Sequence, residues 1–331
     1  MLTSIPNPDH YSAAQSGTVF VEFQRGIIRG TGSDRLDLLH RLSTNAVSQL
    51  RPGEEGTTIL SSDKGRVVEV PRILEFGDHL LMVLLGTDVP GVRAWLDKYT
   101  IMDDFTTADA TPEFALFGVY GQQAKSQLSA VAGCQIPDAG AFAVSESGLI
   151  ILRDTRLNGA GAFLALAPAA RAADVAAQFL EQGISKITPE TWHALRIEAG
   201  QPWIGAELSE SYNPLEAGLS QLISWTKGCY IGQEVIARLD TYDKVQRHLM
   251  GVVIEGMEGF PEEVDVHDPV EGKKIGLLTS LAESPLVGGR IALAYIRTQH
   301  AIPGYRVELQ SGGATVGAGM LVKLPFDAAG R

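Results

Sequence analysis

The chain has 331 residues, of which 45% are hydrophobic and 20% are charged, and its formal net charge is -12 at pH 7. A chain of this length and composition can bury a substantial core and is expected to fold into two or three domains. The acidic balance argues against capture of nucleic acid through its phosphate backbone, because such binding needs a basic surface. No run of 18 apolar residues occurs, so we expect neither a membrane-spanning helix nor a membrane partner.

The cysteines and the first residues bear on the compartment. We expect Cys134 and Cys229 to be free thiols, because a protein of this size needs no disulfide and nothing indicates an oxidising environment. No basic residue precedes Arg25, and the opening residues contain no apolar run, so a secretory or mitochondrial leader is not expected. These features predict a cytosolic protein.

Short strands and helices are predicted over the first 180 residues. In chain order they are strands at 18–23 and 26–32, a helix carrying Leu36, Leu39 and Leu42, a hairpin formed by 56–62 and 65–76, a strand at 79–85, a helix at 90–100, strands at 104–110 and 114–121, a helix from residue 122, a hairpin at 141–153, a strand at 162–167 and a helix at 168–182. Many links between strands are too short for parallel crossovers. The pattern therefore indicates an α+β fold with mainly antiparallel sheets.

The pattern changes after Gln246. Strand-like runs at 248–256, 273–281, 290–296, 305–310 and 315–324 are separated by Gly and Pro clusters, and no helix is evident among them. We expect a small β-barrel or sandwich of about 85 residues. A domain boundary is therefore placed between residues 244 and 245.

The segment 225–239 reads WTKGCYIGQEVIARL. Ile231, Val235 and Leu239 recur every four residues, which predicts a helix that buries these three side chains. Cys229 then lies about where that helix begins.

The neighbours of Cys229 differ from those of a cysteine that only packs in a core. A helix N-terminus and Lys227 would both favour the thiolate. Gly228 and Gly232 would permit close approach of backbone or of a partner. We expect Cys229 to be partly exposed and more reactive than Cys134, which has no cation within four residues.

A second helix is predicted between Pro189 and Gly200, because proline suits a first turn and glycine a C-cap. Trp192 and Arg196 lie one turn apart on it, and Glu198 lies near its end. From these residues alone, the simpler interpretation is an amphipathic helix with Trp192 in the core and Glu198 in solvent.

Common cofactor motifs are absent. The segment GTGSDR from Gly30 lacks the third glycine of a dinucleotide fingerprint, and no Walker A, HExxH or paired CxxC motif occurs. The seven histidines are scattered, so no metal site is predicted.

Three segments resemble a known family in their order and spacing: LRIEAG at 195–200, NPLEAGLS at 213–220 and KGCYIGQE at 227–234. Together with residues 32–66 they resemble the folate-binding YgfZ family, which is related to the T-protein of the glycine cleavage system, an aminomethyltransferase. KGCYIGQE is the specific part. The resemblance implies a three-domain cloverleaf around a central folate channel, with residues 1–244 forming two α+β subdomains and residues 245–331 forming a C-terminal β-barrel.

The resemblance also implies a function. It implies tetrahydrofolate, or another reduced folate, as cofactor, with Trp192 lining the pocket and Glu198 anchoring the pterin, whose paired N–H donors match two carboxylate oxygens. It implies a role in assembling or repairing iron–sulfur clusters of client enzymes, including tRNA-thiolating enzymes, without direct contact with nucleic acid. Partners would be those clients or cluster-assembly proteins. The candidate catalytic residues are Cys229, Lys227, Gln233 and Glu234, and the candidate folate-binding residues are Trp192, Glu198, Tyr230 and Arg238.

Two departures from the family patterns leave alternatives open. Glu69 stands where T-proteins present the first Asp of an acidic pair, and one extra methylene can displace a catalytic group by about 1 Å, enough to weaken it severely. Arg25 stands where some YgfZ proteins have tryptophan; it would face the glutamate tail of folate or only occupy a turn. The alternatives are a folate-dependent aminomethyltransferase or demethylating transferase that uses Glu69, and an interaction module with a relic folate pocket and a structural Cys229. Whether the chain is an enzyme is left open.

Overall fold

The computed structural model describes residues 1–154 and 161–327. The chain divides into two compact units. The barrel unit comprises Met1–Asn7, Glu190–Ser220 and Glu234–Arg331, and the layered unit comprises Pro8–Pro189 and Gln221–Gln233. Both mix helices with mainly antiparallel sheets, which confirms the predicted α+β class.

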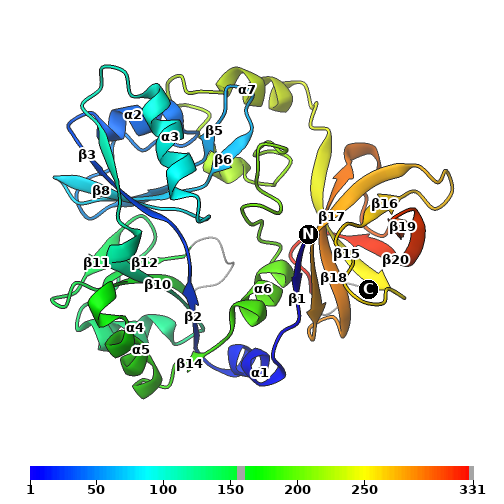
Figure 1. Ribbon diagram of the computed structural model, residues 1–331, viewed down its shortest axis with the longest axis horizontal. Coiled ribbons are helices and arrows are strands. Elements are labelled where there is room, and N and C mark those ends of the chain that lie inside the picture. Colours follow the sequence, from blue (N-terminus) through cyan, green and yellow to red (C-terminus); the bar gives the residue numbers. More distant parts are fainter. Residues whose placement is uncertain (155–160, 328–331) are drawn as a thin grey trace. The chain divides into compact units, whose positions relative to one another are not determined.

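Two sheets form the centre of the layered unit (Figure 1). The first runs in the order β4 (Glu55–Thr57), β7 (Arg72–Glu75), β8 (His79–Val83), β3 (Ile27–Thr31) and β9 (Thr106–Asp109). The second runs in the order β11 (Phe142–Val144), β12 (Ile150–Arg153), β13 (Ala162–Pro168), β10 (Phe114–Tyr120), β2 (Val19–Phe23) and β14 (Ser185–Lys186). The remaining elements of this unit are α1 (Pro8–Ser16), α2 (Arg35–Leu42), α3 (Val89–Tyr99), α4 (Ala124–Ala132), α5 (Ala172–Glu181), the hairpin strands β5 (Leu60–Ser61) and β6 (Val67–Glu69), and the 3₁₀ turns Thr111–Glu113 and Ala169–Arg171.

Helices cover the outer faces of these two sheets. On β3, Ile28 packs into a cluster with α2 and α3, whereas Ile27 points into the cluster shared by the two sheets. Phe117 of the second sheet packs against α5 through Phe179. Successive strand residues point to opposite faces, so a strand buried on both faces is apolar throughout. This explains why the strand runs were readable in the sequence.

The barrel unit contains a closed sheet. Its strands are β15 (Arg247–Glu255), β16 (Asp265–His267), β17 (Lys274–Ser284), β18 (Gly289–Arg297), β19 (Arg306–Ser311) and β20 (Ala314–Val322), with the 3₁₀ turn Thr298–His300. Pairing of β17 with β18 closes the order β17-β16-β19-β20-β15-β18 into a six-stranded barrel. The C-terminal β-barrel is thereby confirmed. β1 (Leu2–Ser4) pairs in parallel with β17, and α6 (Pro189–Glu198) and the barrel share the apolar cluster around Ile197.

Some boundaries differ from the sequence expectation. The first strand and α1 were not predicted, because the opening residues have no apolar run. The predicted boundary between residues 244 and 245 stays a prediction: β15 begins close to it, but Met1–Asn7 and Glu190–Ser220 belong to the same compact unit as the barrel.

The helix after Cys229 was predicted with the wrong start and face. α7 (Gln233–Thr241) begins four residues beyond Cys229. It buries Ile236 completely, while Val235 is 38% exposed. Ile231 instead packs against the apolar cluster beneath α2, so its spacing from Val235 does not mark a helix face.

Candidate functional site

The segment that carries Cys229 is attached to the layered unit by hydrogen bonds from both sides. The 3₁₀ turn Ser220–Leu222 precedes it, and the Leu222 carbonyl accepts a bond from Thr44 Oγ1 at 2.7 Å. Further along, the Ile231 N–H donates to the Arg41 carbonyl at 3.1 Å, and the Ile231 carbonyl accepts from Ser61 Oγ at 2.7 Å. The segment therefore lies over the C-terminal end of α2 and beside β5.

The side chain of Lys227 is held by three hydrogen bonds. Its Nζ donates to three backbone carbonyls, those of His40 at 2.5 Å, Ser43 at 2.7 Å and Asn45 at 2.9 Å. Burial lowers the pKa of Lys227 to about 8. The three N–H donors of Lys227 are directed at carbonyl oxygens, and the expected effect of its charge on the Cys229 thiol stays a prediction.

Tyr230 flanks the cysteine on the other side. Its side chain is 8% exposed, and burial raises the pKa of its phenol to about 12. The Lys227 Nζ lies 5.1 Å from the centre of the Tyr230 ring, within cation–π range. The structure therefore brings these two predicted site residues together.

Cys229 is exposed and Cys134 is partly buried, which confirms the expected exposure of Cys229. The helix N-terminus invoked for its reactivity lies further away than predicted, because α7 begins only at Gln233. Since the helix dipole acts mainly within the first turn, its effect on the thiol is small.

The two glycines of the motif differ. Gly232 has φ +81, and a Cβ there would lie 2.5 Å from the Ser62 carbonyl oxygen, so this position requires glycine. A Cβ at Gly228 would meet nothing within 4 Å. Only Gly232 therefore supports a close approach within the chain.

The remaining candidates of this motif lie on α7. Gln233 is partly buried at its first position, and Glu234 and Arg238 are exposed. Gln233 belongs to the layered unit, whereas Glu234 and Arg238 belong to the barrel unit.

In the barrel unit, α6 carries both other folate-binding candidates. Glu198 is 6% exposed and its Oε1 accepts a hydrogen bond from Ser284 Oγ at 2.5 Å, so the interpretation of Glu198 as a solvated residue is wrong. Trp192 is 4% exposed and meets the Trp203 ring edge to face, with 5.0 Å between ring centres. Trp203 is more exposed than Trp192 and was not predicted; its place after Gly200 gave no periodic signal.

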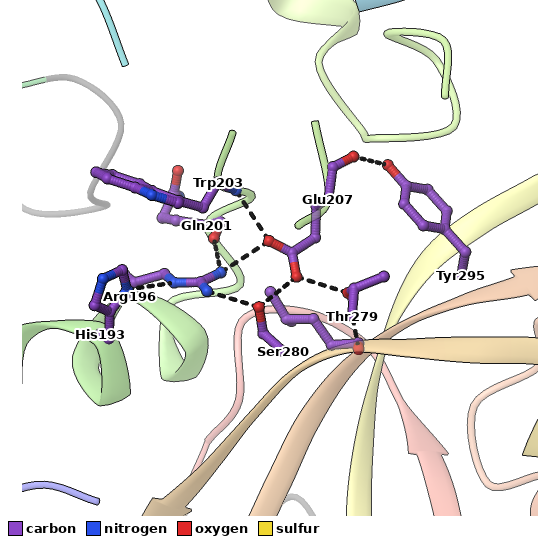
Figure 2. Close-up of polar contacts among 9 residues, drawn as sticks. His193, Arg196, Gln201, Trp203, Glu207, Thr279, Ser280 and Tyr295 are labelled. Atoms are coloured by element: carbon purple, nitrogen blue, oxygen red, sulfur yellow. Dashed lines mark hydrogen bonds and ion pairs between the residues drawn. The ribbon is translucent and has the colours of Figure 1, made fainter. Parts of the chain in front are cut away.

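A buried polar network fixes α6 (Figure 2). Arg196 is fully buried and pairs with Glu207, with 2.9 Å between Nη1 and Oε2. The Glu207 carboxylate also accepts hydrogen bonds from the backbone N–H of Trp203 and from the hydroxyl groups of Thr279 and Ser280 of β17. These contacts satisfy both charges and join α6 to the barrel. Glu207 was missed because a single acid in an irregular segment carries no sequence signal.

Glu69 is the acid that the alternative transferase would use, and its carboxylate is hydrogen-bonded to backbone N–H groups. It is 2% exposed, and its carboxylate accepts hydrogen bonds from the N–H groups of Val70 at 2.8 Å, Leu85 at 2.9 Å and Gly86 at 3.2 Å. Burial raises the pKa of Glu69, which these three bonds oppose. The side chain joins the end of β6 to the residues that follow β8.

Arg25 lies in the link between β2 and β3 and is 3% exposed. Its guanidinium carbon lies 4.0 Å from the centre of the Phe23 ring. It lines a cavity of about 390 Å³ that also involves Gln24, Thr87 and Thr111. The cavity belongs wholly to the layered unit.

Among residues 1–154 and 161–327, no group of three or more His, Cys, Asp or Glu side chains is placed to bind a metal ion. Within the same ranges, no helix is long and apolar enough to cross a membrane.

Two family models match the chain. The GCVT N-terminal domain matches residues 21–227, which is more than half of the chain, and the glycine cleavage T-protein C-terminal barrel domain matches residues 247–327. The chain belongs to the glycine cleavage T-protein family. The predicted relation to the T-protein is confirmed, whereas the narrower resemblance to YgfZ stays a prediction.

Individual relatives match nearly the whole chain. The chain is 28% identical, over 98% of its length and 75% of the relative's, to a protein of Arabidopsis thaliana named "Putative transferase At1g60990, chloroplastic". It is 26% identical, over 96% of its length and 88% of the relative's, to a protein of Symbiobacterium thermophilum named "Aminomethyltransferase". The solved glycine cleavage system aminomethyltransferase T from Bartonella henselae matches with a TM-score of 0.85 at 17% identity, over 98% of this chain and 91% of that one. This likeness shows the T-protein-type fold.

Proposed function

We propose that this T-protein family member binds tetrahydrofolate and supports the assembly or repair of iron–sulfur clusters in client enzymes, including tRNA-thiolating enzymes, through the Cys229 thiol. The observation that carries the proposal is an exposed thiol on a segment whose neighbouring side chains are held by buried contacts. A buried structural cysteine is inert, whereas an exposed one can react with a partner. The partners would be the client enzymes or cluster-assembly proteins, in the cytosol, with no direct nucleic-acid contact.

The described residues fit a reduced folate in the barrel unit. Glu198 is a buried carboxylate that accepts a hydrogen bond from the Ser284 hydroxyl, and a carboxylate is the acceptor that paired pterin N–H donors require. The indoles of Trp192 and Trp203 offer aromatic surface in the same unit. A bound tetrahydrofolate would supply a reduced pterin ring, which these residues would hold and orient. Tyr230 and Arg238 stay proposed contacts of the folate.

A second candidate is an aminomethyltransferase, favoured by the name of the Symbiobacterium relative. It would need Glu69 as its acid. The carboxylate of Glu69 already accepts three backbone N–H bonds, which makes it a poor group for proton transfer to a substrate. We therefore place this activity second, and Gln233 and Glu234 remain candidate participants in the Cys229 chemistry.

The proposal is tested in the source cell by deleting the gene and measuring iron–sulfur enzyme activities together with glycine cleavage. We expect the iron–sulfur activities to fall and glycine cleavage to persist, and we expect the wild-type gene and Cys134→Ser, but not Cys229→Ser, to restore them. Loss of glycine cleavage alone would favour the second candidate. Calorimetry with tetrahydrofolate on the purified protein tests the cofactor separately.

A further inference from the structure

Within the Cys229 segment, Gly228 and Cys229 form an exposed two-residue tip between Lys227 and Tyr230, and Trp225 and Thr226 ahead of Lys227 are exposed as well. Gly228 and Cys229 are exposed, while Lys227 before them is partly buried and Tyr230 after them is 8% exposed. Beyond Tyr230, both backbone groups of Ile231 are hydrogen-bonded, to Arg41 and to Ser61. The tip is therefore held at both of its ends, and its position depends on those two attachments.

The attachment on the side of Lys227 is a helix C-terminus. α2 ends at Leu42, and the Lys227 ammonium binds the carbonyls of His40 in the last turn, Ser43 at the C-cap and Asn45 beyond it. Carbonyls at a helix end have no partner within the helix and carry partial negative charge, so a lysine is well suited to satisfy them.

The geometry calls for lysine in particular. An ammonium presents three N–H donors around one nitrogen, which matches three carbonyl oxygens converging within 2.5 to 2.9 Å of Nζ. A guanidinium presents its donors in a planar fork and cannot place three of them at one point. With all three donors committed to α2, the ammonium has none left for the thiol.

We propose that Lys227 is a positioning residue for Cys229: it fastens the tip to the C-terminal end of α2 and thereby fixes where the thiol is presented to a partner. The proposal rests on the proposed function of Cys229. It differs from an electrostatic role, in which Lys227 would act by stabilising the thiolate.

The test uses this chain with Lys227→Met, which keeps an unbranched side chain one atom shorter and removes the donors. Lys64→Met is the control, because Lys64 is an exposed lysine of the nearby β5–β6 turn. In the Lys227 variant we expect backbone amide exchange of peptides covering residues 224–231 to be about tenfold faster than in wild type, with peptides of the barrel unchanged. The pH midpoint of Cys229 alkylation should stay at its wild-type value. A midpoint that rises in Lys227→Met, with exchange unchanged, would overturn the proposal in favour of the electrostatic role.

The cellular readout asks whether Lys227 acts through Cys229. Lys227→Met should reduce support of iron–sulfur enzymes, and the double variant with Cys229→Ser should be no worse than Cys229→Ser alone. An additive loss in the double variant would overturn the positioning role. If Cys229→Ser itself is fully active, the proposed function fails, while the amide-exchange result still decides whether Lys227 holds the tip. If Lys227→Met does not fold, Lys227→Gln, which keeps two N–H donors, takes its place. We then expect an intermediate rise in the rate of amide exchange, and an unchanged rate would contradict the proposal.

Discussion

The Arg196 guanidinium and the Glu207 carboxylate are paired 2.9 Å apart with both side chains 0% exposed, and they connect the helix that carries Trp192 and Glu198 to the wall of the barrel. Breaking such a pair leaves an uncompensated charge in a medium that solvates it poorly. Burial lowers the pKa of Arg196, and the Glu207 charge opposes that shift. The orientation of α6 thus depends on an acid that lies outside every recognisable motif.

Glu207→Gln should therefore destabilise the protein by about 3–5 kcal/mol, because Arg196 keeps its charge and loses its partner. Urea unfolding followed by tryptophan fluorescence measures the change. The exposed pair of Arg29 and Glu113 is the matched control, with side chains 32% and 47% exposed, and Glu113→Gln should cost no more than about 1 kcal/mol. Equal losses in the two variants would show that the buried pair does not hold α6.

Elements that bury many side chains were predicted from the sequence, and elements that bury few were not. Most strands of both sheets and of the barrel were visible as apolar runs because the protein buries them, whereas the short strands β14 and β16 were not predicted. The turn between β5 and β6 was visible through Gly65, which has φ +65. α1 escaped prediction because it buries a single side chain, Tyr11. A helix that is mostly polar gives no periodic signal.

The candidate site was only partly predictable, for a different reason. Exposure of Cys229 followed from its polar and glycine neighbours, but the target of Lys227 did not, because three backbone carbonyls leave no trace in residue identity. Ile231 fitted a helix by spacing and instead packs beneath α2. Long-range contacts of this kind override local periodicity.

Folate binding should be visible through tryptophan. We expect tetrahydrofolate to quench fluorescence, with Trp203→Phe removing at least as much of the signal as Trp192→Phe, because Trp203 is the more exposed of the two rings. Glu198→Gln should weaken binding by about 1–3 kcal/mol, since it sets an amide donor against pterin donors. Calorimetry gives the affinities, with the exposed Glu190→Gln on the same helix as control. Wild-type affinity in Glu198→Gln would remove this residue from the folate site.

The role of Glu69 separates a structural acid from a catalytic one. Glu69→Gln should lower the free energy of unfolding by about 1–3 kcal/mol, because its amide nitrogen must face a backbone N–H that the carboxylate now satisfies. Wild-type protein should show little aminomethyltransferase turnover with tetrahydrofolate and an aminomethyl-lipoyl carrier. Substantial turnover that disappears in a stably folded Glu69→Gln variant would restore the transferase as the first candidate.

His40 predicts an acid-sensitive contact beside the Cys229 segment. Burial, and secondly the Lys227 charge, lower the pKa of His40 below its ordinary value. Its Nδ1 accepts from the Val47 N–H at 3.3 Å, which requires the neutral ring. As pH falls, His40 is protonated in the unfolded chain at the ordinary histidine pKa, and in the folded protein only at a lower pH. The free energy of unfolding should therefore decrease as pH falls from the ordinary pKa to the pKa of His40 in the folded protein.

Proton NMR of the imidazole should give a His40 pKa below that of an exposed histidine, and the value should rise in Lys227→Met because the neighbouring charge is gone. Thermal unfolding of His40→Gln, whose amide oxygen can still accept, should depend less on pH in the same window. A His40 pKa that is identical in wild type and Lys227→Met would place the ammonium elsewhere.

Cys229 itself gives the most direct measurement. Because its thiol is exposed and that of Cys134 is partly buried, iodoacetamide should label Cys229 first, as read by peptide mass spectrometry over time. The lead should come from accessibility, since α7 begins four residues away and Lys227 is committed to carbonyls. Cys229→Ser should accordingly leave the melting temperature nearly unchanged, because an exposed side chain makes few packing contacts. Slow labelling of Cys229 together with a large loss of thermal stability in Cys229→Ser would mean that the cysteine packs within the fold, and that KGCYIGQE marks a structural segment and not a reactive one.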